Sequence, residues 1–201
     1  MIGKDQKSWV LASHNAGKIN ELSEILESHE IFLQSAADFR LSEPDETEST
    51  FAGNALLKAR SACMATGLPA LADDSGLCVT ALDGQPGIHS ARWAGEPRDF
   101  DRAMARIQSE LEDSSSDDRS ATFVCVLALV RPDGSRRIYE GRVEGEIVWP
   151  PRGDGGFGYD PVFRPDGETR VFAEMTTVEK ARLSHRARAL AAMISAEFGN
   201  D

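Results

Sequence analysis

The chain has 201 residues, of which 41% are hydrophobic and 27% are charged, so it is long enough to bury the core of an ordinary globular domain. Its formal net charge of -11, without any run of lysine or arginine, argues against nucleic-acid binding. The three cysteines are widely spaced in apolar surroundings, which predicts reduced thiols and neither disulfides nor a zinc site. No segment approaches membrane-spanning length, so we expect a cytoplasmic protein without a membrane partner.

The N-terminal segment has the order strand, glycine loop and helix. Residues 9–12 form a short apolar run, and apolar residues at helical spacing begin at Ile19. Between them lie Ser13, His14, Asn15, Ala16, Gly17 and Lys18. The amides of such a loop can bind an anion while a lysine adds positive charge, although Ala12 stands where a Walker A motif has its first glycine. The alternative is an ordinary helix start capped by Ser13 or Asn15.

An acidic loop, residues 42–48, precedes a predicted helix over residues 51–66. The loop is expected to be solvated unless it converges with a further carboxylate on a metal ion. The helix is expected to end at Gly67, with Lys58 and Arg60 on its surface.

The central stretch, residues 69–95, carries the adjacent carboxylates of Asp73 and Asp74. A short apolar strand leads into them and Ser75-Gly76 is expected to break it, which places both carboxylates at a strand end. Two neighbouring carboxylates suit a hard cation such as Mg²⁺, or a pair with separated pKa values. The alternative is an ordinary turn, since Asp, Ser and Gly are the residues from which turns are made.

The second half continues with a predicted helix over 98–111 and strands over 122–130, 137–143 and 145–148. The turn at 132–134 makes the first two of these strands antiparallel. The chain therefore predicts an α/β fold with a mixed sheet.

A glycine-dense segment, residues 153–161, holds Phe157 and Tyr159. Such a loop can present an aromatic face to a planar base, or it can be a hairpin whose aromatics anchor it to the core. One last helix is predicted over 178–198. Its first half includes Lys180, His185 and Arg186; on their own, the lysine and arginine would be taken as solvated and His185 as a capped or surface histidine.

Five separated blocks together resemble one family, the non-canonical purine nucleoside triphosphate pyrophosphatases, also called inosine or xanthosine triphosphate pyrophosphatases. In chain order they are SHNAGK at 13–18, TF and NA within 50–55, ADDSGL at 72–77 continuing to SAR at 90–92, GFGYDP at 156–161, and EK and SHR within 179–186. They span nearly the whole chain. Five blocks in the same order are hard to obtain by chance. The resemblance therefore argues against the alternatives given above, namely a simple helix cap, an ordinary turn and a hairpin.

The resemblance implies a single α/β domain over residues 1–201 that is elongated and two-lobed, with a curved mixed sheet flanked by helices and an active site in the cleft between the lobes. It also implies a homodimer. The implied reaction is Mg²⁺-dependent hydrolysis of inosine, deoxyinosine and xanthosine triphosphates to the monophosphate and pyrophosphate, which cleanses the nucleotide pool.

The resemblance also implies residue roles. Asp74 would be the general base and a Mg²⁺ ligand, with Asp45 or Glu46 as a further metal ligand, and residues 13–18 would hold the triphosphate. The other substrate-binding residues would be Ser75, Phe157, Gly158, Tyr159, Asp160, Lys180, His185 and Arg186. Two positions depart from the family: Gly53 stands where a glutamate is common, which removes a carboxylate near the proposed metal, and Trp93 replaces the usual tyrosine.

Base selectivity would depend on the purine 6-position. A 6-oxo group can accept hydrogen bonds from His185, Arg186 or loop amides, whereas the amino group of adenine would leave those donors unpaired. Two other functions fit the same residues. One is a nucleotide-binding sensor without turnover, and the other is a hydrolase that releases orthophosphate from the γ-position.

Overall fold

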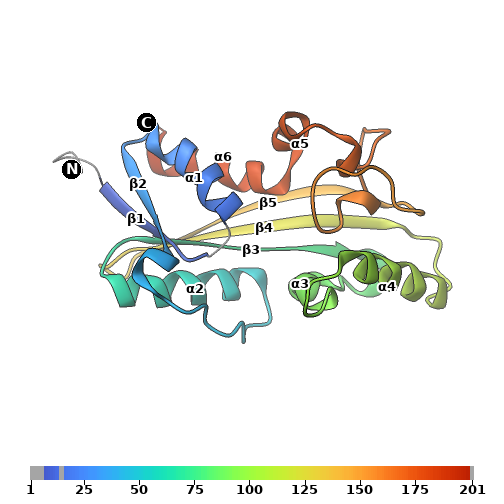
Figure 1. Ribbon diagram of the computed structural model, residues 1–201, viewed down its shortest axis with the longest axis horizontal. Coiled ribbons are helices and arrows are strands. Elements are labelled where there is room, and N and C mark those ends of the chain that lie inside the picture. The colour runs from blue at the N-terminus through green and yellow to red at the C-terminus, as the bar shows by residue number, and fades with distance from the viewer. Residues whose placement is uncertain (1–6, 14–15, 200–201) are drawn as a thin grey trace. The chain divides into compact units, whose positions relative to one another are not determined.

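A computed structural model of the chain describes residues 7–13 and 16–199, with the backbone but not the side chains of residues 16–18, 20, 21 and 24 (Figure 1). The strands are β1 (Lys7–Leu11), β2 (Ile31–Ser35), β3 (Ala70–Val79), β4 (Ser120–Val130), β5 (Arg136–Ile147) and β6 (Phe163–Pro165). The α-helices are α1 (Ala16–Glu27), α2 (Phe51–Thr66), α3 (Ser90–Trp93), α4 (Phe100–Asp113), α5 (Thr177–Leu183) and α6 (His185–Phe198). Short 3-10 helices are η1 (Ala36–Phe39), η2 (Thr80–Leu82), η3 (Gly87–His89), η4 (Asp160–Val162) and η5 (Phe172–Glu174).

The six strands form one sheet in the order β2-β1-β3-β4-β5-β6. Strand β1 is parallel to both β2 and β3, whereas β5 and β6 are antiparallel. The predicted α/β fold with a mixed sheet and flanking helices is therefore confirmed.

The chain divides into two compact units. The first comprises residues 1–74, 126–139 and 193–201, and the second comprises residues 75–125 and 140–192. The strands β3, β4 and β5 each contribute residues to both units. The elongated two-lobed shape and the cleft between lobes stay predictions.

In the first unit, α1 packs on β2 and α2 packs on β1. Helix α2 has the predicted bounds, because the side chain of Thr50 accepts a hydrogen bond from the Gly53 amide at 3.0 Å and Gly67 ends the helix with a φ of 69°. Its small buried residues, Ala55 and Ala59 among them, let the helix lie close to the sheet. The sequence pattern therefore located this helix correctly.

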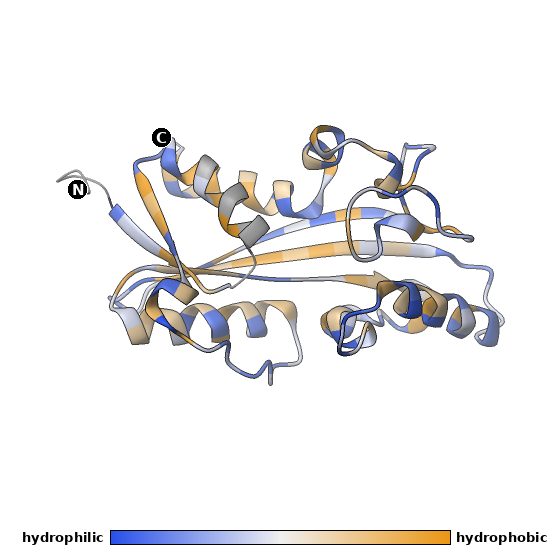
Figure 2. Cartoon of the chain, viewed as in Figure 1, coloured by the Kyte–Doolittle hydropathy of each residue, from blue (hydrophilic) through white to orange (hydrophobic). Residues whose placement is uncertain are grey.

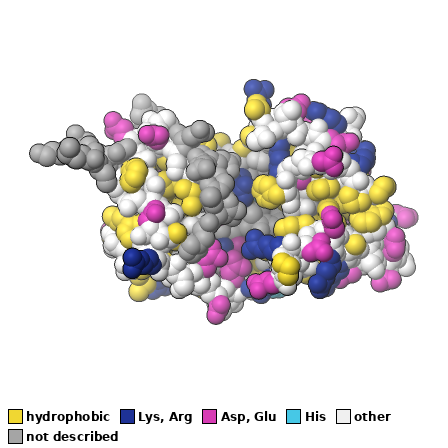
Figure 3. Space-filling model, viewed as in Figure 1, with side chains coloured by type: hydrophobic (Ala, Val, Ile, Leu, Met, Phe, Trp, Pro, Cys, Tyr) yellow, Lys and Arg dark blue, Asp and Glu magenta, His cyan; other side chains and the backbone are white. Residues whose placement is uncertain are grey.

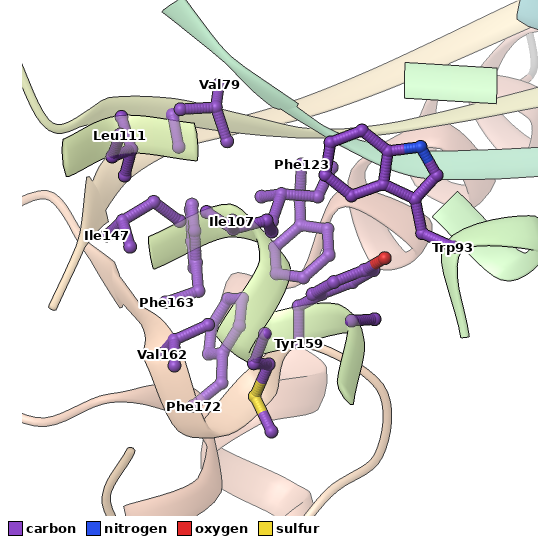
Figure 4. Close-up of a cluster of buried hydrophobic side chains, with 14 of the residues drawn as sticks. Val79, Trp93, Ile107, Leu111, Phe123, Ile147, Tyr159, Val162, Phe163 and Phe172 are labelled. Atoms are coloured by element: carbon purple, nitrogen blue, oxygen red, sulfur yellow. The ribbon is translucent and has the colours of Figure 1, made fainter. Parts of the chain in front are cut away.

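The second unit has an aromatic core. Phe123, Phe163 and Phe172 contact one another, with ring centroids 4.6 to 6.0 Å apart. Figure 4 shows these rings together with aliphatic side chains from several other elements, all directed into one cluster. Strand β4, which supplies Phe123, is almost wholly buried, and Figure 2 shows the hydrophobic run along it. Burial on both faces explains why this strand does not alternate in polarity.

The surface carries both signs of charge. On the face shown in Figure 3, acidic, basic and apolar side chains of the described residues are interspersed. Within those residues, none of the helices is both long enough and apolar enough to cross a membrane.

Two strand predictions were wrong. Ser75-Gly76 does not break the central strand, because β3 runs through it from Ala70 to Val79 with β4 alongside; Asp73 and Asp74 therefore lie within the strand and not, as was expected, at its end. The predicted strands over 137–143 and 145–148 are one continuous strand, β5. In each case the polar or glycine residue lies within a strand that has hydrogen-bonded neighbours on both sides in the sheet, and pairing of this kind satisfies backbone groups whatever the side chain.

The predicted last helix is two helices. Ser184 separates α5 from α6, since its ψ of 150° is extended rather than helical. Its hydroxyl accepts a hydrogen bond from the Ala187 amide at 3.2 Å, as an N-cap residue does. The helical period alone did not reveal this interruption.

Candidate active site

Asp73 and Asp74 lie in β3 just beyond the pairing of this strand with β1. The last paired residues are Leu11 and Leu71, after which the Ala12 amide donates to the Leu71 carbonyl at 2.8 Å. Both aspartates are buried. They therefore follow the carboxyl end of a neighbouring parallel strand, the position where α/β sheets place reactive groups.

Lys58 reaches Asp74 from α2. Its Nζ lies 2.9 Å from Oδ1 of Asp74 and 2.9 Å from Oε1 of Glu46 in the acidic loop. The Lys58 side chain is only 11% exposed, so the expectation of a surface lysine was wrong. Two acidic residues were expected near Asp74. Glu46 pairs with the same lysine as Asp74, whereas Asp45 is exposed.

The group formed by Asp74, Glu46 and Lys58 carries an excess of negative charge. Burial raises the pKa of Asp74 above its ordinary value, against the opposing effect of Lys58. Burial also works to lower the pKa of Lys58, but Asp74 and Glu46 outweigh it and the Lys58 pKa is raised. A protonated lysine between two carboxylates compensates one of them, so the group can accept a further positive charge.

Asn54 connects the same three segments one helical turn before Lys58. Its side chain is buried, and its Oδ1 accepts a hydrogen bond from the Glu48 amide at 3.1 Å. Its Nδ2 donates to Oδ2 of Asp74 at 3.4 Å. The acidic loop, α2 and β3 are thus joined through one amide.

The predicted phosphate loop follows β1. Ser13 is buried, and α1 begins at Ala16, so the strand, loop and helix order is confirmed. His14 and Asn15 lie outside the described residues, as do the side chains of Ala16, Gly17 and Lys18. A cavity of about 210 Å³ in the first unit is lined by Ala12, by the acidic loop and by Lys58.

In the second unit, the glycine-dense loop folds around the carboxylate of Asp160. This buried carboxylate accepts a hydrogen bond from the Phe157 amide at 2.8 Å and pairs with Lys180. Gly156 has a φ of 72°, and a Cβ on it would lie 2.1 Å from Oδ2 of Asp160, so only glycine fits there. Burial raises the pKa of Asp160, although Lys180 opposes this.

The two aromatics of this loop have different environments. The Phe157 side chain is 65% exposed, and Lys180 Nζ lies 4.3 Å from its ring centroid. Tyr159 is only 3% exposed, and its hydroxyl donates to the Ser90 carbonyl at 2.7 Å. Phe157 therefore offers a ring face, while Tyr159 anchors the loop to the core.

Lys180 lies on α5, and His185 and Arg186 begin α6. All three belong to the second unit, and His185 and Arg186 are buried, so Arg186 is not solvated and His185 is not a surface histidine. The His185 ring is stacked on Phe123 with centroids 4.8 Å apart. Phe123 thus fixes the orientation of this imidazole.

A model of the Ham1 family matches residues 9–196 of the chain. The chain belongs to the Ham1 family. It is 54% identical over 186 residues to the dITP/XTP pyrophosphatase of Gluconobacter oxydans, covering 92% of this chain and 88% of that protein. It is 53% identical over 191 residues to the dITP/XTP pyrophosphatase of Rhodospirillum centenum, covering 94% of each. The structure of a HAM1 protein from Coxiella burnetii is similar with a TM-score of 0.92 and 41% identity, over 95% of this chain and 98% of that one.

Among the residues described for this Ham1 family member, no group of three or more His, Cys, Asp or Glu is arranged to hold a metal ion. Mg²⁺ often uses only one or two protein carboxylates, with substrate phosphates and water as its other ligands. Asp74 and Glu46 each place an oxygen 2.9 Å from one cationic atom, so their carboxylates already converge on one region. This donor set fits Mg²⁺, with Glu46 rather than the exposed Asp45 beside Asp74.

Sequence reasoning missed Asn54 and Lys58. They are four residues apart on α2, and Asn54 falls among its buried residues. A polar residue in the apolar stripe of a helix needs a buried partner, and that signal could have identified Asn54. Ser75 follows Asp74 in β3 as a half-buried residue and begins the second unit.

Proposed function

We propose that residues 1–201 form one domain that hydrolyses non-canonical purine nucleoside triphosphates, namely those of inosine, deoxyinosine and xanthosine, to the monophosphate and pyrophosphate. The buried Asp74, paired with Lys58 next to Glu46, is the observation that carries the proposal. The names of the relatives in Gluconobacter and Rhodospirillum, both dITP/XTP pyrophosphatases, support the substrate class.

In this proposal Asp74 takes the proton of the attacking water. Burial raises its pKa, which makes its carboxylate a stronger base than an ordinary aspartate. The water attacks the α-phosphorus in line and pyrophosphate leaves. Residues 13–18 and the start of α1 hold the phosphates through backbone amides, and Lys18 contributes its charge.

Asp74 and Glu46 are the residues that would hold Mg²⁺. When bound, this ion neutralises phosphate charge and makes an attached water more acidic. Lys58 neutralises one of the two carboxylates and keeps them close together.

The residues of the second unit recognise the base in this proposal. The exposed ring of Phe157 stacks on the purine, and Lys180 is held in place by Asp160. His185 and Arg186 donate to the 6-oxo group. Adenine is disfavoured because its amino group would leave these donors unpaired.

Asp74→Asn tests the assignment of the base. The variant keeps the size of the side chain but cannot take a proton, so turnover of inosine triphosphate should fall by about 100-fold or more while nucleotide binding changes little. Turnover at the parent rate would show that Asp74 is not the base. A sensor would bind nucleotide without turnover, and a γ-phosphatase would release orthophosphate.

Two further proposals are a homodimer, which the resemblance implies, and a cytoplasmic location, which the sequence composition predicts. Analytical ultracentrifugation of the purified chain tests the first. A sedimenting species of twice the chain mass of 21.9 kDa supports it, and a monomer at micromolar concentration contradicts it.

A further inference from the structure

The side-chain amide of Asn54 accepts one hydrogen bond and donates another. Its oxygen accepts from the backbone of Glu48, and its nitrogen donates to the carboxylate of Asp74. The residue is 1% exposed, so water does not compete for these bonds. A carboxylate at this position could not donate, and an apolar residue could make neither bond.

The neighbouring Gly53 lets the acidic loop lie directly on the first turn of α2. A Cβ on Gly53 would lie 2.7 Å from Cβ and 3.0 Å from Cγ of Glu48. The nearer atom is attached to the loop backbone and cannot swing away, so any side chain at residue 53 would displace the loop. The room that a side chain at residue 53 would need is thus occupied by Glu48.

We propose that Asn54 is a positioning residue that sets the spacing between Asp74 and Glu46, the pair that would hold Mg²⁺. Glu46 lies two residues before Glu48, whose backbone Asn54 holds, and Asn54 bonds to Asp74 directly. Gly53 permits this arrangement by leaving room for Glu48. The inference rests on the proposed function, because it assigns Asn54 to the metal site of that reaction.

The test compares Asn54→Leu, Gly53→Ala and the double variant Gly53→Ala with Glu48→Gly. Met64→Ala is the control, because Met64 lies on the same helix and is 76% exposed. Three quantities are measured: the affinity for Mn²⁺ by electron paramagnetic resonance of the free ion, kcat and KM for inosine triphosphate with Mg²⁺, and the Tm. Mn²⁺ binding requires no turnover.

Asn54→Leu should bind Mn²⁺ about 10- to 100-fold more weakly and lose kcat by a similar factor, as expected when a residue that orients a metal ligand is removed. Gly53→Ala should weaken Mn²⁺ binding with Asn54 intact, and Glu48→Gly should restore it by removing the clashing Cβ. Met64→Ala should match the parent.

Mn²⁺ affinity within about twofold of the parent in both single variants, with only the Tm lowered, would overturn the proposal because a purely structural role predicts that result. A parent that binds no Mn²⁺ would overturn it as well. A parent that releases no pyrophosphate, but whose variants lose Mn²⁺ affinity as expected, would refute the proposed function and leave the role of Asn54 standing.

Discussion

Lys58→Met tests whether Lys58 neutralises the buried carboxylate of Asp74. The variant keeps an unbranched apolar stem but removes the charge that lies 2.9 Å from Asp74 and from Glu46. Removing one partner of a buried ion pair costs about 3–5 kcal/mol. The Glu46 side chain is 30% exposed and can turn to water, so we expect a loss near the lower limit, about 3 kcal/mol. For a chain of this length that corresponds to a decrease in Tm of about 6–12 °C.

Thermal unfolding at pH 7 measures this loss. Arg60→Met is the matched control, because Arg60 is exposed on the same helix and its removal should change the unfolding free energy by less than about 0.5 kcal/mol. Adding Asp74→Asn to Lys58→Met should recover part of the stability, because it removes the uncompensated buried charge. A loss no larger than that of the control, or a double variant no more stable than Lys58→Met, would refute the reasoning.

Three further predictions concern the second unit. Phe157→Ala should raise KM for inosine triphosphate by about 5- to 150-fold with a smaller effect on kcat, since stacking on an aromatic ring contributes about 1–3 kcal/mol per base; an unchanged KM would exclude the ring as a platform. Tyr159→Phe should lower the unfolding free energy by about 1–3 kcal/mol by leaving the Ser90 carbonyl without its donor, and its KM should change less than in Phe157→Ala. Hydrogen bonds from Arg170 lower the pKa of Glu179 from its ordinary 4.5 to about 2, so Glu179 stabilises the fold fully above pH 4.5 and loses this contribution as the pH falls toward 2. The difference in Tm between the parent and Glu179→Gln should therefore narrow from pH 6 to pH 3, and a constant difference would contradict the assigned pKa.

The helix over 51–66 could be predicted because its signals are local. Its apolar period, the cap at Thr50 and the glycine at residue 67 each act within a few residues of chain. The break at Ser184 is also local, but a serine within a helical period is compatible with a continuous helix. The continuity of β3 through Gly76 depends on the neighbouring strands, which the local pattern does not contain.

The candidate site likewise has a part that could be predicted from the sequence and a part that depends on tertiary packing. The blocks around Asp74 and Asp160 were found because one has two adjacent carboxylates, the other has two aromatics in a glycine-dense segment, and the order of the blocks resembles a family. The partner of Asp74 was missed, because Lys58 is 16 residues away and only the packing of α2 brings it there. Asn54 and Lys58, spaced by one helical turn on a buried face, show that a polar pair within an apolar stripe merits a functional interpretation.

The central claim is tested most directly by the identity of the products. The purified chain is incubated with Mg²⁺ and inosine, xanthosine, guanosine and adenosine triphosphates in parallel, and pyrophosphate and orthophosphate are measured separately. We predict pyrophosphate from the inosine and xanthosine substrates and little from the other two. Orthophosphate as the product would move the reaction to the γ-position, and no product from any substrate would contradict the assignment as an enzyme.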